Sequence, residues 1–472
     1  MAISTPETEL SIKNLSLEEV ERQAERAIKL GSPERNGKNI PFPIIVTLPL
    51  KEINILSWLE SINRTPKVYW CSRDCQLEIG GIGASLTISE EDPGLVQQKF
   101  ELIERILQYS APSRHLGFIG GSNFNFADAG NSEWTSFPTM WFVLPEIFIH
   151  RFKDQYSLNI SSLFENGASA KYIARKLVKK AERLNSHDSP KRSSALPNIQ
   201  IRRDLPAFPR WAKNVTESLE RIQRGEVKKV VLARRTDLVC SGEIGWVEVA
   251  RRLKNHNENC FFYCFQPARG IAFLGATPER LFKINERTLV SEAVSGTIAR
   301  SGTLEEDLES GISLLHSEKN LREHQFVVDA IKKIKDKLCD NIVTHSKPSL
   351  LELSNVQHLY TRIAGELREG ISLYDLLSTL HPTPAVGGTP RGKALELIRD
   401  LEAFDRGWYA GPVGILSQEW SEVVVALRSL LVSGNMARIY AGAGIVRGSE
   451  PESEWQELES KISIALQIFN GA

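Results

Sequence analysis

Two basic side chains lie inside sequences that otherwise read as buried strands, and both could do chemistry. In VKKVVLARR, strand alternation places Lys229 on the same face as Val227 and Val231. Apolar neighbours weaken the hydration of an ammonium group, which lowers the pKa of a lysine and makes it a candidate general base. Alternatively, Lys229 is a solvent-exposed residue at a sheet edge. Lys228 points to the opposite face and serves as a natural control.

Arg428 stands in the apolar run VVVALRSLL, which reads as a single strand. A guanidinium group is rarely buried unless it is paired, and its planar fork matches a carboxylate. Arg428 is therefore a candidate for binding an anionic ligand.

Three glutamates occupy positions that suit either solvent or a site. Glu279 follows a proline in the turn after the apolar run IAFLG, where a glutamate commonly starts a helix. Glu323 in REHQFVVDAI and Glu457 in EWQELESKI lie on separate expected helices, where a glutamate ordinarily belongs to the solvated face. Glu454 and Lys461, at helical spacing on either side of Glu457, lie on the same flank and can interact with it.

The stretch GGTPRGKA, residues 387–394, contains most of a phosphate-binding loop. Lys393 is followed by an alanine, so the hydroxyl that would bind magnesium is missing, and Pro390 removes a backbone donor. The preceding STLHPTP reads as a helix end and an extended turn instead of the required strand. Nucleotide binding is therefore not expected, and the glycine pair must serve another purpose.

The composition excludes several functional classes. The 472 residues include 58 basic and 58 acidic side chains, so the formal net charge is zero and no bulk field attracts nucleic acid or an anionic membrane. The six cysteines show no metal-binding spacing. No run approaches ~18 apolar residues, so no membrane span is expected. The N-terminal sequence resembles neither a secretory signal nor a transit peptide, which predicts a protein of the reducing cytoplasm.

Hydrophobic periodicity predicts both helices and strands. Helical spacing recurs in residues 15–30, 95–109, 170–184, 210–225 and from about Pro451 onward. Strands are expected in residues 77–89, 117–126, 140–152 and 227–235, and residues 411–416, 422–432 and 437–446 read as an antiparallel meander. Strand clusters with interspersed helices predict an α+β fold, with large antiparallel sheets in a sandwich-like core and helices packed outside.

The polar segment NSHDSPKRSSALPN, residues 185–198, is the most linker-like part of the chain. It suggests an N-terminal α+β part, residues 1–200, that is integrated with a catalytic region, residues 201–472.

Eight motifs, in order along the chain, resemble the chorismate-utilising enzymes. They are VKKVVLARR, GATPERLF, REHQFVVDAI, VQHLYTRI, LHPTPAVGGTPR, WYAGPVG, YAGAGIV and EWQELESKI. The resemblance runs from about Trp211 to the C-terminus. It implies the fold of that family, chorismate as substrate and Mg²⁺ as cofactor.

The resemblance also implies roles for individual residues. Lys229 corresponds to the general base, Glu279 to the general acid, and Glu323 and Glu457 to the Mg²⁺ ligands, with Glu454 able to take part through a water. The substrate-binding positions are Gly296, Thr297, His358, Ala385, Val386, Tyr409, Arg428, Gly442, Gly444 and Lys461.

Two positions predict the reaction within this family. Lys229 is present and Ser295 occupies the place where one branch has a nucleophilic lysine, so water is the expected nucleophile. Ala385 stands where the pyruvate-eliminating synthases have threonine, so the expected product is isochorismate, for quinone or siderophore biosynthesis.

The closest competing function is that of a salicylate synthase, which forms isochorismate and then eliminates pyruvate. A P-loop nucleotide-binding protein fits the sequence less well, because the phosphate-binding loop is incomplete. An inactive scaffold fits less well too, because the base, the acid and both metal ligands are present. We expect no amidotransferase subunit, and a monomer.

Overall fold

The computed structural model describes residues 16–31, 40–127, 132–182, 195–300, 303–345, 347–353 and 356–470, and the side chains of Glu323, Ile464 and Asn470 are not among those described. The first fifteen residues lie outside these ranges, as do residues 183–194, which include most of the expected linker. Predictions that rest on those two segments stay predictions.

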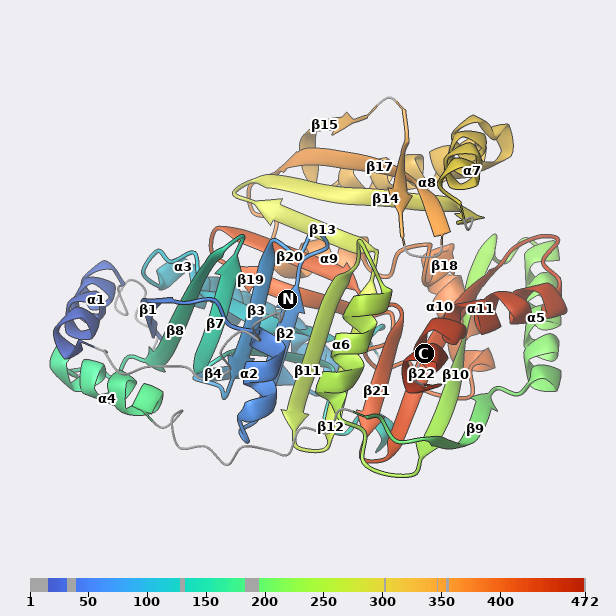
Figure 1. Ribbon diagram of the computed structural model, residues 1–472. Coiled ribbons are helices and arrows are strands. Elements are labelled where there is room, and N and C mark those ends of the chain that lie inside the picture. The colour runs from blue at the N-terminus through green and yellow to red at the C-terminus, as the bar shows by residue number, and fades with distance from the viewer. Residues whose placement is uncertain are drawn as a thin grey trace.

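Two large sheets form the molecule, and every strand pair in them is antiparallel (Figure 1). The first sheet has twelve strands, in the order β1 (Pro43–Leu50), β8 (Gln155–Leu163), β7 (Ile147–Phe152), β3 (Leu77–Ile82), β2 (Lys67–Cys71), β11 (Phe261–Ala268), β12 (Ile271–Thr277), β21 (Ser429–Ser433), β22 (Met436–Ile445), β10 (Lys229–Cys240) and β18 (Gly388–Thr389), with β9 (Ile199–Leu205) also paired to β10.

The second sheet has ten strands, in the order β15 (Cys339–Thr344), β17 (Val356–Leu367), β14 (Thr288–Ala299), β13 (Arg280–Asn285), β20 (Trp420–Val425), β19 (Pro412–Ser417), β5 (Gly117–Ser122), β6 (Met140–Leu144) and β4 (Leu86–Glu90), with β16 (Ser349–Glu352) also paired to β17. These two antiparallel sheets confirm the predicted fold class. Each sheet contains strands from before and after residue 200, so the two parts of the chain share both sheets.

Helices cover the sheets from outside (Figure 1). They are α1 (Leu17–Leu30), α2 (Ile55–Ser61), α3 (Val96–Tyr109), α4 (Ala170–Glu182), α5 (Phe208–Gln223), α6 (Trp246–His256), α7 (Leu304–His316), α8 (Glu318–Lys335), α9 (Leu373–Leu380), α10 (Arg391–Leu401) and α11 (Pro451–Asn470). Helices α1 and α4 lie together at one end, whereas α5 and α11 lie together at the other. Across the described residues, no helix is both long and apolar enough to cross a membrane.

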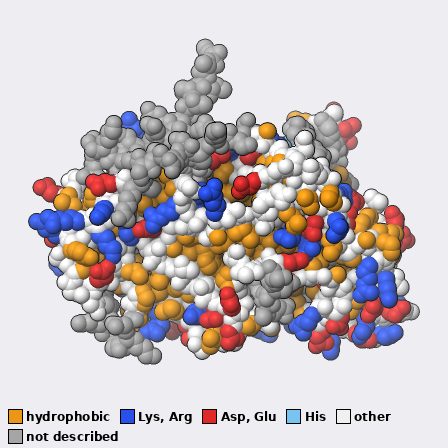
Figure 2. All heavy atoms as spheres, turned by 90° about the horizontal axis from the view of Figure 1, so that it is seen from below, with side chains coloured by type: hydrophobic (Ala, Val, Ile, Leu, Met, Phe, Trp, Pro, Cys, Tyr) orange, Lys and Arg blue, Asp and Glu red, His pale blue; other side chains and the backbone are white. Residues whose placement is uncertain are grey.

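The core between the sheets is rich in aromatic rings. Trp408 is fully buried and its ring contacts Phe265 of the first sheet at 5.5 Å and Trp141 of the second at 6.4 Å between centroids. Its indole nitrogen donates to the carbonyl of Pro138 at 2.9 Å, so the one polar atom of the side chain is satisfied. All six cysteines are free thiols. On the face seen in Figure 2, basic and acidic side chains are interspersed, in keeping with the zero net charge.

The expected strand at residues 422–432 is wrong in one respect: it is two strands in different sheets. Strand β20 ends at Val425 in the second sheet, and β21 starts at Ser429 in the first. Arg428 lies in the connection, with φ of 47°. The apolar run did not reveal the break because both strands are buried, and a continuous hydrophobic sequence does not record which sheet a strand joins.

A second connection between the sheets runs beside the first. The chain leaves β12 at Thr277 and enters β13 at Arg280. The Val425 amide donates to the Glu279 carbonyl at 3.0 Å, and the Ala276 amide donates to the Arg428 carbonyl at 3.3 Å. Glu279 and Arg428 therefore sit on adjacent, hydrogen-bonded passes of the chain between the two sheets.

The glycine pair of the apparent phosphate loop supports the strand that carries Lys229. In the two-residue strand β18, Gly388 pairs with Val230 and Thr389 with Lys229. Gly388 has φ of 142°, and a Cβ atom there would lie 2.3 Å from the Lys229 carbonyl oxygen. Only glycine allows this close approach of two backbones. Lys393 is an exposed helical residue of α10, paired with Glu396 at 2.8 Å, as expected for an ordinary surface lysine.

Gly388→Ala should destabilise the protein by about 2 kcal/mol, because the new methyl group overlaps the backbone of β10, and should lower its activity. Gly387→Ala is the matched control, since a Cβ atom there meets its nearest neighbours at 3.4 Å. Chemical denaturation of both variants checks this; equal stability of the two would contradict it.

Candidate active site

Lys229 begins β10 and its side chain passes over Gly444 of β22. A Cβ atom on Gly444 would lie 3.0 Å from Cε and 3.5 Å from Nζ of Lys229, so the glycine leaves the space that the lysine occupies. Lys229 is half-buried whereas Lys228 is exposed, as the strand alternation predicts. The neutral amine expected at Lys229 stays a prediction.

Glu279 holds its proton to a higher pH than an ordinary glutamate does. Burial, the largest influence, raises the pKa of its carboxyl to about 7. A hydrogen bond from the Thr383 hydroxyl, at 3.4 Å, and the charge of Lys229 act in the opposite direction, while the charge of Glu292 adds to the rise. The influence of Lys229 indicates that the expected base and acid lie near each other.

A group of cations gathers around His358, on β17. Burial, together with the charges of Arg428 and Lys461, lowers the pKa of His358 to about 4. Its Nδ1 atom is 3.0 Å from the Thr297 hydroxyl and 3.3 Å from the Gly296 carbonyl. The imidazole is therefore neutral at pH 7. Arg428 and Lys461 give this region positive charge, and Lys461 is at the same time paired with Glu457 at 2.6 Å.

Glycine residues also leave space for neighbouring side chains in this region. A Cβ atom on Gly442 would lie 3.0 Å from the Tyr409 hydroxyl, and the Gly442 carbonyl accepts from Lys461 at 2.8 Å. The Gly296 backbone, with φ of 64°, forms the irregularity in β14 that faces His358.

The loop before β18 completes the wall. Val386 is buried, and its carbonyl accepts a hydrogen bond from Arg406 at 2.9 Å, whereas Ala385 is exposed. Arg406 also donates to the Val231 carbonyl at 2.7 Å and pairs with buried Glu402 at 2.5 Å. This pair, which no sequence motif indicated, fastens the loop to the strand of Lys229.

The expected metal ligands are described in part. Glu457 on α11 is half-exposed and pairs with Lys461 at 2.6 Å. Burial raises the pKa of nearby Glu454, and the charge of Glu457 raises it further, so two carboxylates crowd one flank of the helix. Such oxygen donors suit Mg²⁺. Glu323 lies on α8, but its side chain is outside those described, and the described residues alone contain no cluster of three or more possible ligands.

Ser295 anchors the helix that carries Glu323. Its hydroxyl is 2.8 Å from Nδ1 of His324, and Nε2 of that ring is 2.7 Å from the Thr361 hydroxyl. His324 is 3% exposed. The histidine of the REH motif was the residue in the sequence from which this contact could have been predicted. The role of Ser295 is to hold that histidine in place.

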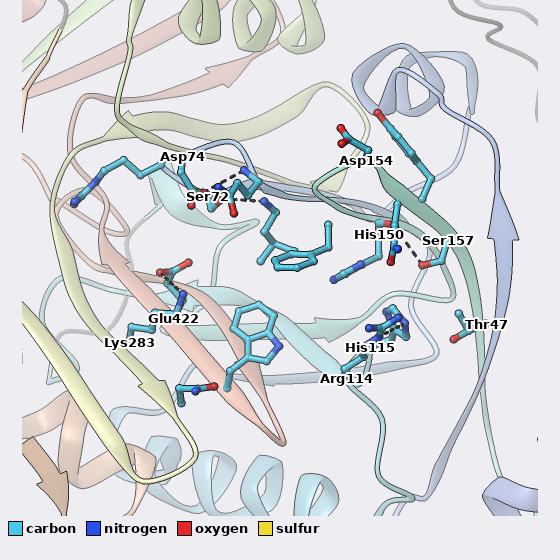
Figure 3. A pocket seen from close by; sticks show the side chains of 18 of the residues that line it. Thr47, Ser72, Asp74, Arg114, His115, His150, Asp154, Ser157, Lys283 and Glu422 are labelled. Carbon is cyan, nitrogen blue, oxygen red and sulfur yellow. Dashed lines mark hydrogen bonds and ion pairs between the residues drawn. The ribbon is translucent and has the colours of Figure 1, made fainter. Parts of the chain in front are cut away.

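A buried network that the sequence did not predict lies beneath Glu279, formed by Arg73, Arg280, Glu292 and Glu422. Arg73 comes from the N-terminal part, where no motif pointed to it. Arg73 and Arg280 also line a cavity of about 1010 Å³. Figure 3 shows Glu422 and Lys283 on one side of this cavity and His115 and His150 on the other. None of the predicted site residues lines it.

Comparison with known proteins decides the family. A family model described as "Chorismate binding enzyme" matches residues 31–470. The chain belongs to the chorismate binding enzyme family. The match reaches well into the N-terminal part, whereas the motifs were recognised only from about Trp211 onward.

Similar members of the family are isochorismate synthases. The chain is 32% identical to the isochorismate synthase MenF of Bacillus subtilis (strain 168) over 420 residues, covering 86% of this chain and 88% of that protein. The structure of the menaquinone-specific isochorismate synthase MenF of Escherichia coli matches with a TM-score of 0.80 and 29% identity, over 96% of this chain and 98% of the other. Anthranilate synthase component I of Streptococcus pneumoniae shares the fold, with a TM-score of 0.68 and 20% identity, over 82% of this chain and 92% of the other.

Glu279→Gln should stabilise the protein at high pH. The native pKa lies above that of an unfolded glutamate, so ionisation favours unfolding, and stability is lost as the pH rises from about 4.5 to about 7. The uncharged glutamine removes this loss. We expect the variant to be more stable than the parent by about 2 kcal/mol at pH 8, a value reduced for the partial solvent contact of the carboxyl, and nearly equal to it at pH 4.5.

Denaturant titrations at both pH values test this. Glu396→Gln, at an exposed ion pair, is the control and should show no such pH-dependent difference. A Glu279→Gln variant that tracks the parent at every pH would contradict a protonated Glu279.

Proposed function

We propose that this protein is an isochorismate synthase, an isomerase that converts chorismate reversibly into isochorismate. The observation that carries the proposal is the carboxyl of Glu279, whose pKa is raised to about 7 and which lies within the electrostatic reach of Lys229. Isochorismate synthases that match this chain over most of their length support the same conclusion.

Lys229 acts as the base and Glu279 as the acid while one hydroxyl group is added to the ring and another leaves it. Lys229, once it has given up its own proton, takes a proton from a water molecule as that water attacks C2 of the chorismate ring. The ring double bonds shift, and Glu279 gives its proton to the C4 hydroxyl, which leaves as water. Hydroxide is a poor leaving group, so a proton on Glu279 is as necessary as the nucleophile. The reverse reaction exchanges the roles of the two side chains.

The surrounding cations recognise a substrate with two carboxylates. Arg428 binds the enolpyruvyl carboxylate through its planar fork, with Tyr409 and the backbone near Gly442 and Gly444 beside it. Lys461 adds positive charge, and neutral His358, with Thr297, lines the ring side by hydrogen bonding.

Glu457 and Glu323 would hold Mg²⁺, with Glu454 available through a water. The bound ion supplies the positive charge that offsets the ring carboxylate of the substrate. Without a cation, Glu457 is balanced by Lys461.

Product analysis tests the proposed function. Incubation with chorismate and Mg²⁺, without ammonium, should give isochorismate in equilibrium with chorismate, and chelation of the metal by EDTA should stop the reaction until Mg²⁺ is restored. Accumulation of salicylate and pyruvate would instead show a salicylate synthase. An amine product on addition of ammonium would contradict water as the nucleophile.

Lys229→Ala should reduce turnover by roughly 10³-fold or more while chorismate still binds, because the base is lost but Arg428 and Lys461 remain. Turnover by chromatography and binding by calorimetry separate the two effects. Lys228→Ala, one residue away and exposed, should behave like the parent. Full activity of Lys229→Ala would rule out the base assignment.

A further inference from the structure

Glu292, on β14, is a fully buried carboxylate held between two guanidinium groups. Arg73 Nη2 is 2.6 Å from Oε2 of Glu292, and Arg280 Nη1 pairs with Oε1. The Tyr360 hydroxyl donates to Oε1 at 3.0 Å. The side chain of Glu292 has no solvent exposure, so these three donors replace water for both of its oxygens.

The same network fixes the backbone on both sides of Glu279. Arg73 Nη2 donates to the Pro278 carbonyl at 2.5 Å, directly before Glu279, and Arg280 follows directly after it. Both guanidinium groups lie over the ring of Phe261, with Cζ at 4.9 Å and 5.1 Å from its centroid. Because its neighbours on both sides are tied to Glu292, the turn that presents Glu279 cannot shift without breaking buried ion pairs.

Glu292 also contributes negative charge to the surroundings of Glu279. Burial raises the pKa of Glu279, and the carboxylate of Glu292 raises it too. The Thr383 hydroxyl and Lys229, on β10, lower it. The phenol of Tyr409 also faces this carboxyl, since the charge of Glu279 is among the causes that raise the tyrosine's own pKa. Among the described side chains, the charge of Glu292 favours the protonated form of Glu279 and the charge of Lys229 opposes it.

We propose that Glu292, clamped by Arg73 and Arg280, is a positioning residue that holds the turn of Glu279 in place and adds negative charge to the surroundings of its carboxyl. Arg73 extends this role to the N-terminal part of the chain. The catalytic consequence rests on the proposed function, but the coupling between the two carboxyls does not.

Glu292→Gln keeps the shape of the side chain and removes its charge. Glu279 then loses a proton more readily, so the basic limb of the kcat/KM profile should move to lower pH by roughly 0.5 to 1, giving a roughly three- to tenfold loss at pH 8 and little loss at pH 6. KM should change little, because Glu292 does not face the cations that bind substrate.

Arg73→Lys keeps the charge but cannot bind both Glu292 and the Pro278 carbonyl with one planar fork. It should lower kcat roughly fivefold at all pH values and leave the basic limb in place. The matched control is Glu422→Gln, because Glu422 is also a buried carboxylate, bound to Arg280 at 3.0 Å from β20. It removes a similar charge pair and should leave the limb unmoved.

Infrared titration of the carboxyl C=O band, as a difference between each protein and its Glu279→Gln counterpart, measures the Glu279 proton without turnover. Glu292→Gln should lower this titration, and Arg73→Lys and Glu422→Gln should not. If the protein does not form isochorismate but the titration moves as expected, the proposed function fails and the coupling stands.

Two results overturn the proposal: a titration of Glu279 that Glu292→Gln leaves unchanged, or one that Glu422→Gln moves equally. Should Glu292→Gln not fold, Arg73→Lys decides the matter. A basic limb displaced in that variant, or a kcat equal to that of the parent, overturns the proposal as well.

Discussion

Two adjacent passes of the chain between the sheets impose the constraint on which the site depends. One pass carries Glu279 and the other carries Arg428, and each donates a backbone hydrogen bond to the other. An expected proton donor and an expected carboxylate-binding group are thereby fixed relative to each other by main chain alone. The remaining groups come from both sheets, with Lys229 on the first and His358 on the second.

Opposing electrostatic influences act on the carboxyl of Glu279. Withdrawal of water from Glu279 favours its neutral form, and the nearby ammonium of Lys229 opposes that preference. The hydrogen bond from Thr383 also lowers the pKa and the charge of Glu292 raises it, and these influences together set a pKa of about 7. A carboxyl at that balance can both give and take a proton near neutral pH, which a reversible isomerisation requires. His358 differs: two neighbouring cations reinforce the effect of its burial and keep it neutral.

The sequence predicted the elements better than their assembly. Lys229 is half-buried and Lys228 exposed, which agrees with strand alternation, and the two antiparallel sheets and the final helix were found where periodicity indicated them. The break at Arg428 was missed because hydrophobic periodicity carries no information on a change of sheet. Arg73 was missed because its partners, Glu292 and the Pro278 carbonyl, are over 200 residues away, and a long-range ion pair leaves no local pattern. The roles of the metal-binding glutamates stay predictions.

The two-residue strand β18 has a kinetic consequence. It is a continuation of the loop that carries Ala385 and Val386, and it supplies the ladder partner of Lys229 at the rim of the twelve-stranded sheet. Any outward swing of that loop to admit a ligand or release one would strip hydrogen bonds from the segment bearing the amine. Such a swing would therefore free the end of β10 that bears Lys229 from its ladder partner.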